Sequence, residues 1–205
     1  FEREGGTFES RMTPYTQMRL QPGMIGRGMY TLQYGTLDFA TLKRNGPGLL
    51  EVLRNIKTDK DFKEFTAYAV SKRALEKAEQ GKETGVPLDS ARATVVELGA
   101  KYESTFKEMV EFQNRTVDFV VDSGVLSREV RNSILEANKD YVPFYRVLDE
   151  AVSMSGSNFS SAVRNPFKRF KGSQKKIVNP IESVHLNALH HIALAERNKA
   201  FTSFI

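Results

Sequence analysis

The sequence predicts an all-α fold, in the form of an irregular helical bundle with one long central helix and an extended N-terminal arm. Apolar residues recur at spacings of three and four over most of the chain after residue 30, as they do on one face of a helix. Alternating runs of β-branched residues, which indicate strands, are almost missing. With 205 residues, of which 40% are hydrophobic and 27% charged, the chain can bury one substantial core.

We expect residues 1–29 to form the arm, because glycine and proline are too frequent there for long helices or strands. The glycines at positions 23, 26 and 28 match neither nucleotide-binding fingerprint, since their spacing differs and no predicted strand precedes them. A helix is predicted over residues 30–43. A short helix is then predicted over 47–56, because Pro47 suits a first helical turn and apolar residues follow it at helical spacing.

Two further helices form the centre of the predicted bundle. Thr58 or Asp59 can cap a helix over 59–80, and Gly81 follows its end. Its apolar face is expected to contain Phe62, Phe65, Ala69, Lys72, Leu75 and Ala78. Asp89 or Ser90 can cap the longest helix, in which helical spacing of apolar residues continues for about 30 residues, or about 45 Å, up to Gly124.

The apolar stripe on this longest helix has two interpretations. It can form an intermolecular coiled coil, or it can pack inside the bundle against the helices at 59–80 and 180–202. Further apolar residues beside the stripe make the face broad, and this breadth favours the bundle. These residues are Val96, Val110, Phe112 and Phe119.

The rest of the predicted bundle, which spans residues 30–150, contains one more helix with Ser127 as its cap. A turn is predicted at Val142, because the residue before a proline is pushed away from helical dihedral angles. Residues 151–179 are predicted to be a basic loop or linker. Asn179 and Pro180 have the pattern of a capped helix start, so we expect residues 180–205 to form a C-terminal helix that packs on the bundle.

The strongest functional signal is the charge of residues 151–181, which contain no acidic residue. The basic residues of this stretch are Arg164, Lys168, Arg169, Lys171, Lys175 and Lys176. The net charge of the chain is +5, so with these six cations set apart the remainder sums to −1. Clustered cations bind phosphates, and the interleaved phenylalanines can stack on unpaired bases, so we predict contact with DNA or another polyanion. The alternative is a solvated loop that its phenylalanines anchor to the helices.

No other pattern indicates a catalytic, metal or cofactor site. Glu182 and His185 have the Glu-x-x-His spacing of di-iron helices, but such sites need a second copy on a facing helix. His190 and His191 point about 140° and 240° away from His185, so the three imidazoles cannot converge on one ion. Cysteine is missing, which removes cysteine nucleophiles and thiolate metal sites. We therefore expect no enzyme activity, no metal and no cofactor.

No apolar run approaches the roughly 20 residues needed to cross a bilayer, so we expect no membrane span. The chain begins at Phe1 and ends within a helical pattern. We interpret it as a piece of a longer polypeptide.

Two short motifs resemble a known helical module. The first is Ala-Asn-Lys-Asp-Tyr-Val-Pro-Phe-Tyr-Arg at 137–146, and the second is Asn-Pro-Ile-Glu at 179–182, followed by a helix with Ala-Glu-Arg-Asn at 195–198. They are similar to a module of large polyvalent proteins, which are very large proteins of phages and mobile elements. Similar segments occur in virion proteins that leave the capsid with the genome. The resemblance covers roughly residues 90–205 and carries no catalytic residues.

Four residues of the first motif are predicted to be structural. Tyr141 and Tyr145 can bury their rings on either side of the turn at Pro143, while their hydroxyls reach polar partners. Arg146 can hold a nearby carboxylate.

We therefore predict a non-enzymatic structural or interaction module of a phage virion or DNA-ejection protein. It is expected in the virion interior, or in the host bacterial cytoplasm after delivery. The expected partners are DNA or another polyanion, other parts of the parent polypeptide and virion proteins, and a homo-oligomer is compatible with the sequence. Two alternatives remain: a DNA-handling region of a mobile-element polyprotein, and an accessory domain of an enzyme whose active site lies outside this chain.

Overall fold

The computed structural model describes residues 24–38, 41, 43–139, 142–143 and 179–202. The described part is all-α apart from one two-stranded hairpin, which confirms the predicted fold class. Its elements are α2 (Met24–Tyr34), β1 (Thr36–Leu37), β2 (Arg44–Asn45), α3 (Leu49–Val52), η4 (Leu53–Asn55), α4 (Asp59–Glu79), α5 (Leu88–Asp122), α6 (Arg128–Glu136) and α9 (Pro180–Thr202).

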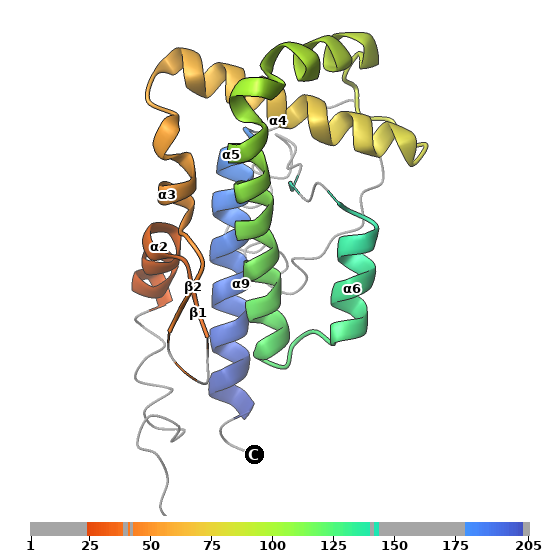
Figure 1. Cartoon of the computed structure of the whole chain (residues 1–205). Coiled ribbons are helices and arrows are strands. Elements are labelled where there is room, and N and C mark those ends of the chain that lie inside the picture. The colour runs from red at the N-terminus through yellow and green to blue at the C-terminus, as the bar shows by residue number, and fades with distance from the viewer. Residues whose placement is uncertain (1–23, 39–40, 42, 140–141, 144–178, 203–205) are drawn as a thin grey trace, which may run out of the picture.

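The long helix α5 organises the molecule. Its longer, C-terminal part lies beside α9, and its N-terminal part turns across the top of the molecule next to α4 (Figure 1). Helices α2 and α3 lie on one side of this pair, and α6 lies on the other (Figure 1). Helix α4 and the start of α5 thus form one layer. It crosses one end of the second layer, which α9 and the longer part of α5 form.

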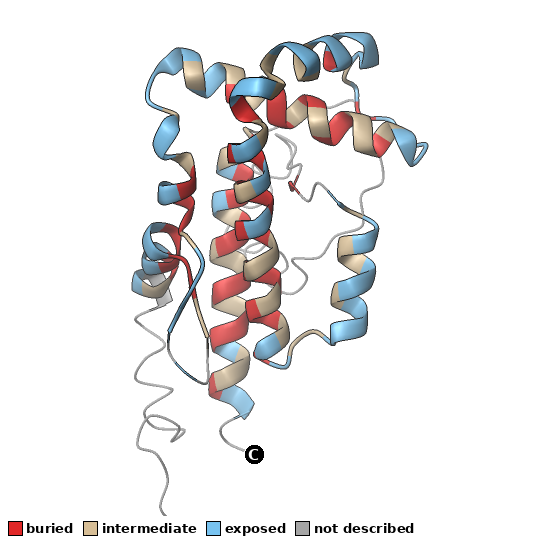
Figure 2. Ribbon diagram, in the orientation of Figure 1, coloured by how far each residue is buried: buried red, intermediate tan, exposed pale blue. Residues whose placement is uncertain are grey.

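Most of the core lies where these layers meet. The rings of Phe65 and Tyr68 on α4 pack against Tyr102 and Phe106 on α5, with centroid distances of 5.7 Å for Phe65–Tyr102 and 5.8 Å for Tyr68–Phe106. Both pairs have edge-to-face geometry, which contributes about 0.5–1.5 kcal/mol per pair beyond the burial of area. Buried residues also line the whole α5–α9 contact (Figure 2).

The predicted ends of the helices are mostly confirmed. Thr58 and Asp61 form a reciprocal capping box at the start of α4, and the Ser127 hydroxyl accepts from Val130 N at the start of α6. Gly81 and Gly124 adopt positive φ angles of 68° and 82° just after α4 and α5, where a glycine favours helix termination. The predicted caps of α5 were wrong: the helix begins at Leu88 with Pro87 in the cap position, so Asp89 and Ser90 lie inside its first turn.

The N-terminal prediction was wrong in two respects. Residues 24–29 belong to helix α2 rather than to an extended arm, and the predicted helix over 30–43 is replaced by the end of α2 and the hairpin. Gly28 lies close against α9: a Cβ built there would lie 2.5 Å from Leu189 Cδ2. Gly35, with a φ of 94°, ends α2. Gly28, one of the glycines that suggested an extended arm, thus allows α2 and α9 to approach closely.

The broad apolar face of α5 is mostly buried. Val110, Phe112 and Phe119 are buried as predicted, and α9 covers much of this face within the same chain, as the bundle interpretation required. Val96 was placed on this face but is 84% exposed. Phe62 of α4 was also expected in the core and is 43% exposed. Among the described helices, none is long and apolar enough to cross a membrane.

Candidate interaction site at the start of α9

The first turn of α9 is fixed by Asn179. Its side-chain oxygen accepts from Ile181 N at 2.9 Å, and its backbone oxygen accepts from Ser183 N at 2.9 Å, which confirms the predicted cap. The same side chain donates through Nδ2 to Thr66 Oγ1 of α4 at 3.2 Å. Asn179 therefore caps α9 and ties its start to α4.

A cleft of about 550 Å³ lies between these two helices. Phe62 contributes from α4, and the remaining lining residues are Asn179, Ile181, Glu182, His185 and Leu186. Because Asn179 bonds to Thr66, α9 begins opposite the second turn of α4, and Phe62 in the first turn extends beyond it. The fold thus leaves the Phe62 ring partly uncovered beside a carboxylate and an imidazole.

The basic residues that the sequence singled out, Arg164, Lys168, Arg169, Lys171, Lys175 and Lys176, lie outside the described residues. Both flanks of this stretch are described. Val142 is fully buried in the main core cluster, Pro143 is buried next to it, and Asn179 is bonded to α4. The segment between Pro143 and Asn179 therefore starts and ends on the folded body.

Of the four residues predicted to be structural, Pro143 is described and is buried. Tyr141, Tyr145 and Arg146 lie outside the described residues.

The histidines do not converge on a metal. His191 is fully buried and has Nδ1 2.8 Å from Thr116 Oγ1 and Nε2 3.4 Å from Asn187 Nδ2. The Thr116 hydroxyl donates to Gln113 O at 2.8 Å, so it accepts from His191 Nδ1–H, and this assigns the tautomer. Burial, with neighbouring His190, lowers the pKa of His191 to about 3. Within the described part of the chain, no group of three potential ligands is placed to hold a metal.

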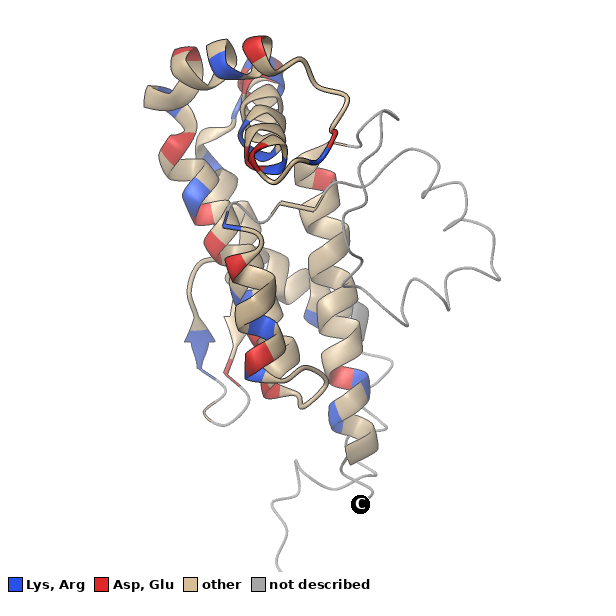
Figure 3. Ribbon diagram, turned by 90° about the vertical axis from the view of Figure 1, so that its right-hand side faces the viewer, with Lys and Arg blue, Asp and Glu red and all other residues tan. Residues whose placement is uncertain are grey.

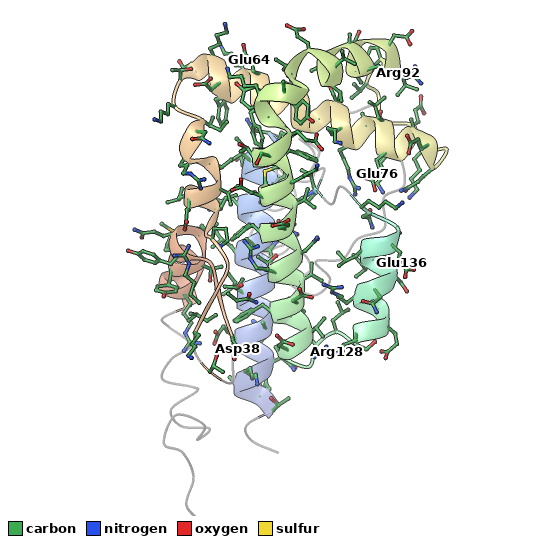
Figure 4. All side chains as sticks on the ribbon, viewed as in Figure 1. Asp38, Glu64, Glu76, Arg92, Arg128 and Glu136 are labelled. Atoms are coloured by element: carbon green, nitrogen blue, oxygen red, sulfur yellow. The ribbon has the colours of Figure 1, made fainter. Side chains whose placement is uncertain are left out.

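Sequence reasoning missed a pair of buried cations on α4. Arg73 pairs with Glu76, and both Arg73 and Lys77 donate to Asn138 Oδ1, each at 2.8 Å. Lys77 also donates to Gln80 Oε1 and to the carbonyl of Ala137, the residue that ends α6. Burial lowers the pKa of Lys77 to about 8. Figure 4 shows Glu76 near the same end of α6 as Glu136, so this cluster secures α6.

Many charged side chains of the described residues form ion pairs with one another. Lys101 Nζ lies 2.9 Å from Asp61 and 2.8 Å from Glu64, and these hydrogen bonds hold the pKa values of both carboxyls below their usual range. Arg131 forms two hydrogen bonds with Asp118, which joins α6 to α5. Lysines, arginines and carboxylates alternate over α4 and α5, and no charged residue lies between Glu182 and Glu196 on α9 (Figure 3).

Comparisons with protein-family models, curated proteins and solved structures found no match to this chain.

Proposed function

We propose that this chain is a non-enzymatic interaction module of a phage virion or DNA-ejection protein, in which the basic segment contacts DNA or an acidic partner. One observation supports the arrangement above all others. The described residues on either side of the six cations are fixed to the folded body, at Val142–Pro143 and at Asn179. The helical body then acts as a scaffold that presents a tethered stretch of cations.

The charge balance supports the same division. Outside residues 151–181 the chain sums to −1, and many charges of the described body are engaged in ion pairs with one another. A polyanion would therefore gain most from the basic segment, where no carboxylate competes with its phosphates. The resemblance to large polyvalent proteins supports the setting, which is the virion interior or the host cytoplasm after delivery.

The test is a salt titration of DNA binding by the variant Lys168→Ala/Arg169→Ala/Lys171→Ala. If each cation neutralises one phosphate, affinity should fall, and the slope of log K against log salt should flatten by up to about 2.7. An unchanged slope would reject DNA contact by this segment.

The matched control is Lys43→Ala/Arg92→Ala/Arg128→Ala, which removes the same charge from exposed positions of the described body. We expect its slope to stay close to that of the unmodified chain. A search for the polypeptide in purified virions tests the setting. Its absence there would favour a mobile-element protein that acts in the host cytoplasm.

A further inference from the structure

The outward face of α2 carries exposed apolar side chains and no charge. Met29, Tyr30 and Tyr34 are 55%, 41% and 44% exposed, and Gln33 and Gly26 are exposed on the same face. The helix lies at an outer edge of the described molecule, with its exposed residues turned away from α9 (Figure 2). Exposed tyrosine and methionine without charged neighbours are typical of the centre of a protein–protein interface.

The residues of this face are arranged so that it can pack against a second copy of itself. Gly26 and Tyr34 lie four residues to either side of Tyr30, about 6 Å away in each direction along the helix axis. When two copies of α2 pack antiparallel about a two-fold axis at Tyr30, Tyr34 of each copy lies over Gly26 of the other. A Cβ built at Gly26 has nothing within 4 Å, so the surface there is open to a ring.

Gly26 has no explanation within the described part of the chain. The other glycine of α2, Gly28, allows close contact with Leu189 of α9, whereas Gly26 faces open space. Glycine has a low helix propensity, so alanine would suit the helix better at a position without contacts. Close approach of a second copy supplies the reason for a glycine that the single chain lacks.

The charges of α2 also permit this arrangement. Its sequence contains one charged residue, Arg27, which forms an ion pair with Glu196 of α9 in the same chain. Arg27 and Gln33 lie three residues to either side of Tyr30, so in the antiparallel pair Arg27 falls opposite Gln33 of the second copy. No like charges meet across the two-fold axis, where they would oppose association.

We propose that the chain forms a two-fold dimer through this face of α2, in which Tyr34 of each copy packs over Gly26 of the other. The inference goes beyond the proposed function and does not rest on it, because no residue of the basic segment takes part. One face of an 11-residue helix, about 16 Å long, supplies less area than the roughly 800 Å² per partner of a standard interface. We therefore expect a weak dimer that forms with rising protein concentration.

The first experiment is a charge exchange at the two-fold axis, followed by sedimentation of the full chain from micromolar to millimolar concentration. Tyr30→Glu and Tyr30→Lys each place two like charges opposite one another, so each should weaken self-association about tenfold or more. An equimolar mixture of the two variants should recover a dimer, because opposite charges then meet. Phe201→Glu and Phe201→Lys are the controls, since Phe201 is exposed near the end of α9, and both should self-associate like the unmodified chain.

The second experiment fills the open position at Gly26. Gly26→Leu has room in the single chain and improves the helix propensity of α2, so the melting temperature should not fall. The added side chain occupies the place of the Tyr34 ring of the second copy, so self-association should weaken about tenfold. The matched control is Gly99→Leu, which adds the same side chain at a glycine of α5 that also has nothing within 4 Å of a built Cβ. It should leave self-association unchanged.

Three results would overturn the inference. The unmodified chain could stay monomeric over the whole concentration range, Tyr30→Glu could self-associate as strongly as the unmodified chain, or the Glu and Lys variants could fail to combine. The variant Lys168→Ala/Arg169→Ala/Lys171→Ala keeps α2 intact and should dimerise like the unmodified chain, whether or not it binds DNA. Failure of the dimer and failure of the proposed function are therefore told apart.

Discussion

At the scale of single residues, burial decides which polar groups shape the molecule. His191, Asn187 and Ser183 lie at intervals of four on α9 and are all buried, and His191 bonds to Thr116 of α5. Polar groups enclosed in this way cost free energy unless they are bonded in one register. The bond between His191 and Thr116 therefore helps to fix how α9 aligns with α5, in addition to the apolar residues around it.

The pH dependence of stability should report on His191. Its pKa is lowered from 6.5 to about 3 by burial in the folded chain, so the unfolded chain binds a proton first as the pH falls below 6.5. Stability should consequently drop by up to about 1.4 kcal/mol for each pH unit below 6.5. We expect a loss of about 2 kcal/mol between about pH 6.5 and about pH 5, measured by urea unfolding.

The variant His191→Gln keeps a polar side chain but cannot be protonated, so its stability should be nearly flat over this interval. His185→Gln is the control, because His185 is exposed, and it should keep the slope of the unmodified chain. An equal slope in all three proteins would exclude His191 as the group that titrates.

At the scale of elements, helical spacing predicted α4, α5, α6 and α9 from the sequence, and the caps of α4, α6 and α9 were also predicted. They could not predict α2, because Gly26 and Gly28 indicated a loop, while the reason for Gly28 is a contact with Leu189, far along the chain. The buried cations Arg73 and Lys77 were missed for a similar reason. Their partners Ala137 and Asn138 follow a separate helix.

The cleft was only partly predictable. The spacing of Phe62 and Phe65 placed both on one face, but it carries no information on where the neighbouring helix begins. That boundary is set by the bond between Asn179 and Thr66. The sequence analysis considered Glu182 and His185 only as possible metal ligands, an interpretation it rejected, and it did not place them beside Phe62.

Two glycine substitutions should have opposite effects on these elements. Gly99 lies inside α5 with nothing within 4 Å of a Cβ built there, so Gly99→Ala should stabilise the protein by about 0.5–1 kcal/mol through helix propensity. A Cβ at Gly48 would lie 2.5 Å from the backbone of Gln33, so Gly48→Ala should destabilise it by about 1–3 kcal/mol.

Thermal unfolding of both variants tests these values. A loss of stability in Gly99→Ala would show that α5 needs glycine where it passes from α4 to α9. An unchanged Gly48→Ala would show that α3 can move away from α2 without cost.

At the scale of the whole molecule, the described core is assembled from α2, α3, α4, α5 and α9, with Val142 as the last contribution before the basic segment. The chain then returns at Asn179 to complete the bundle with α9. Val142 is a core residue and Asn179 is bonded to α4, whereas the six cations belong to the stretch between these two anchors. Replacing that stretch alone should therefore abolish the proposed binding and leave the stability of the protein nearly unchanged.

We expect this separation when residues 151–177 are exchanged for a glycine–serine segment of equal length. Equal length leaves the entropy of loop closure nearly unchanged, and both anchors remain, so the melting temperature should shift by less than about 4 °C. DNA binding should be lost in the same protein. Val142→Ala is the matched control, because it removes a buried anchor and keeps every cation, and it should lower the melting temperature while DNA binding at low temperature persists. Loss of cooperative unfolding in the exchanged protein would show instead that the segment is part of the core.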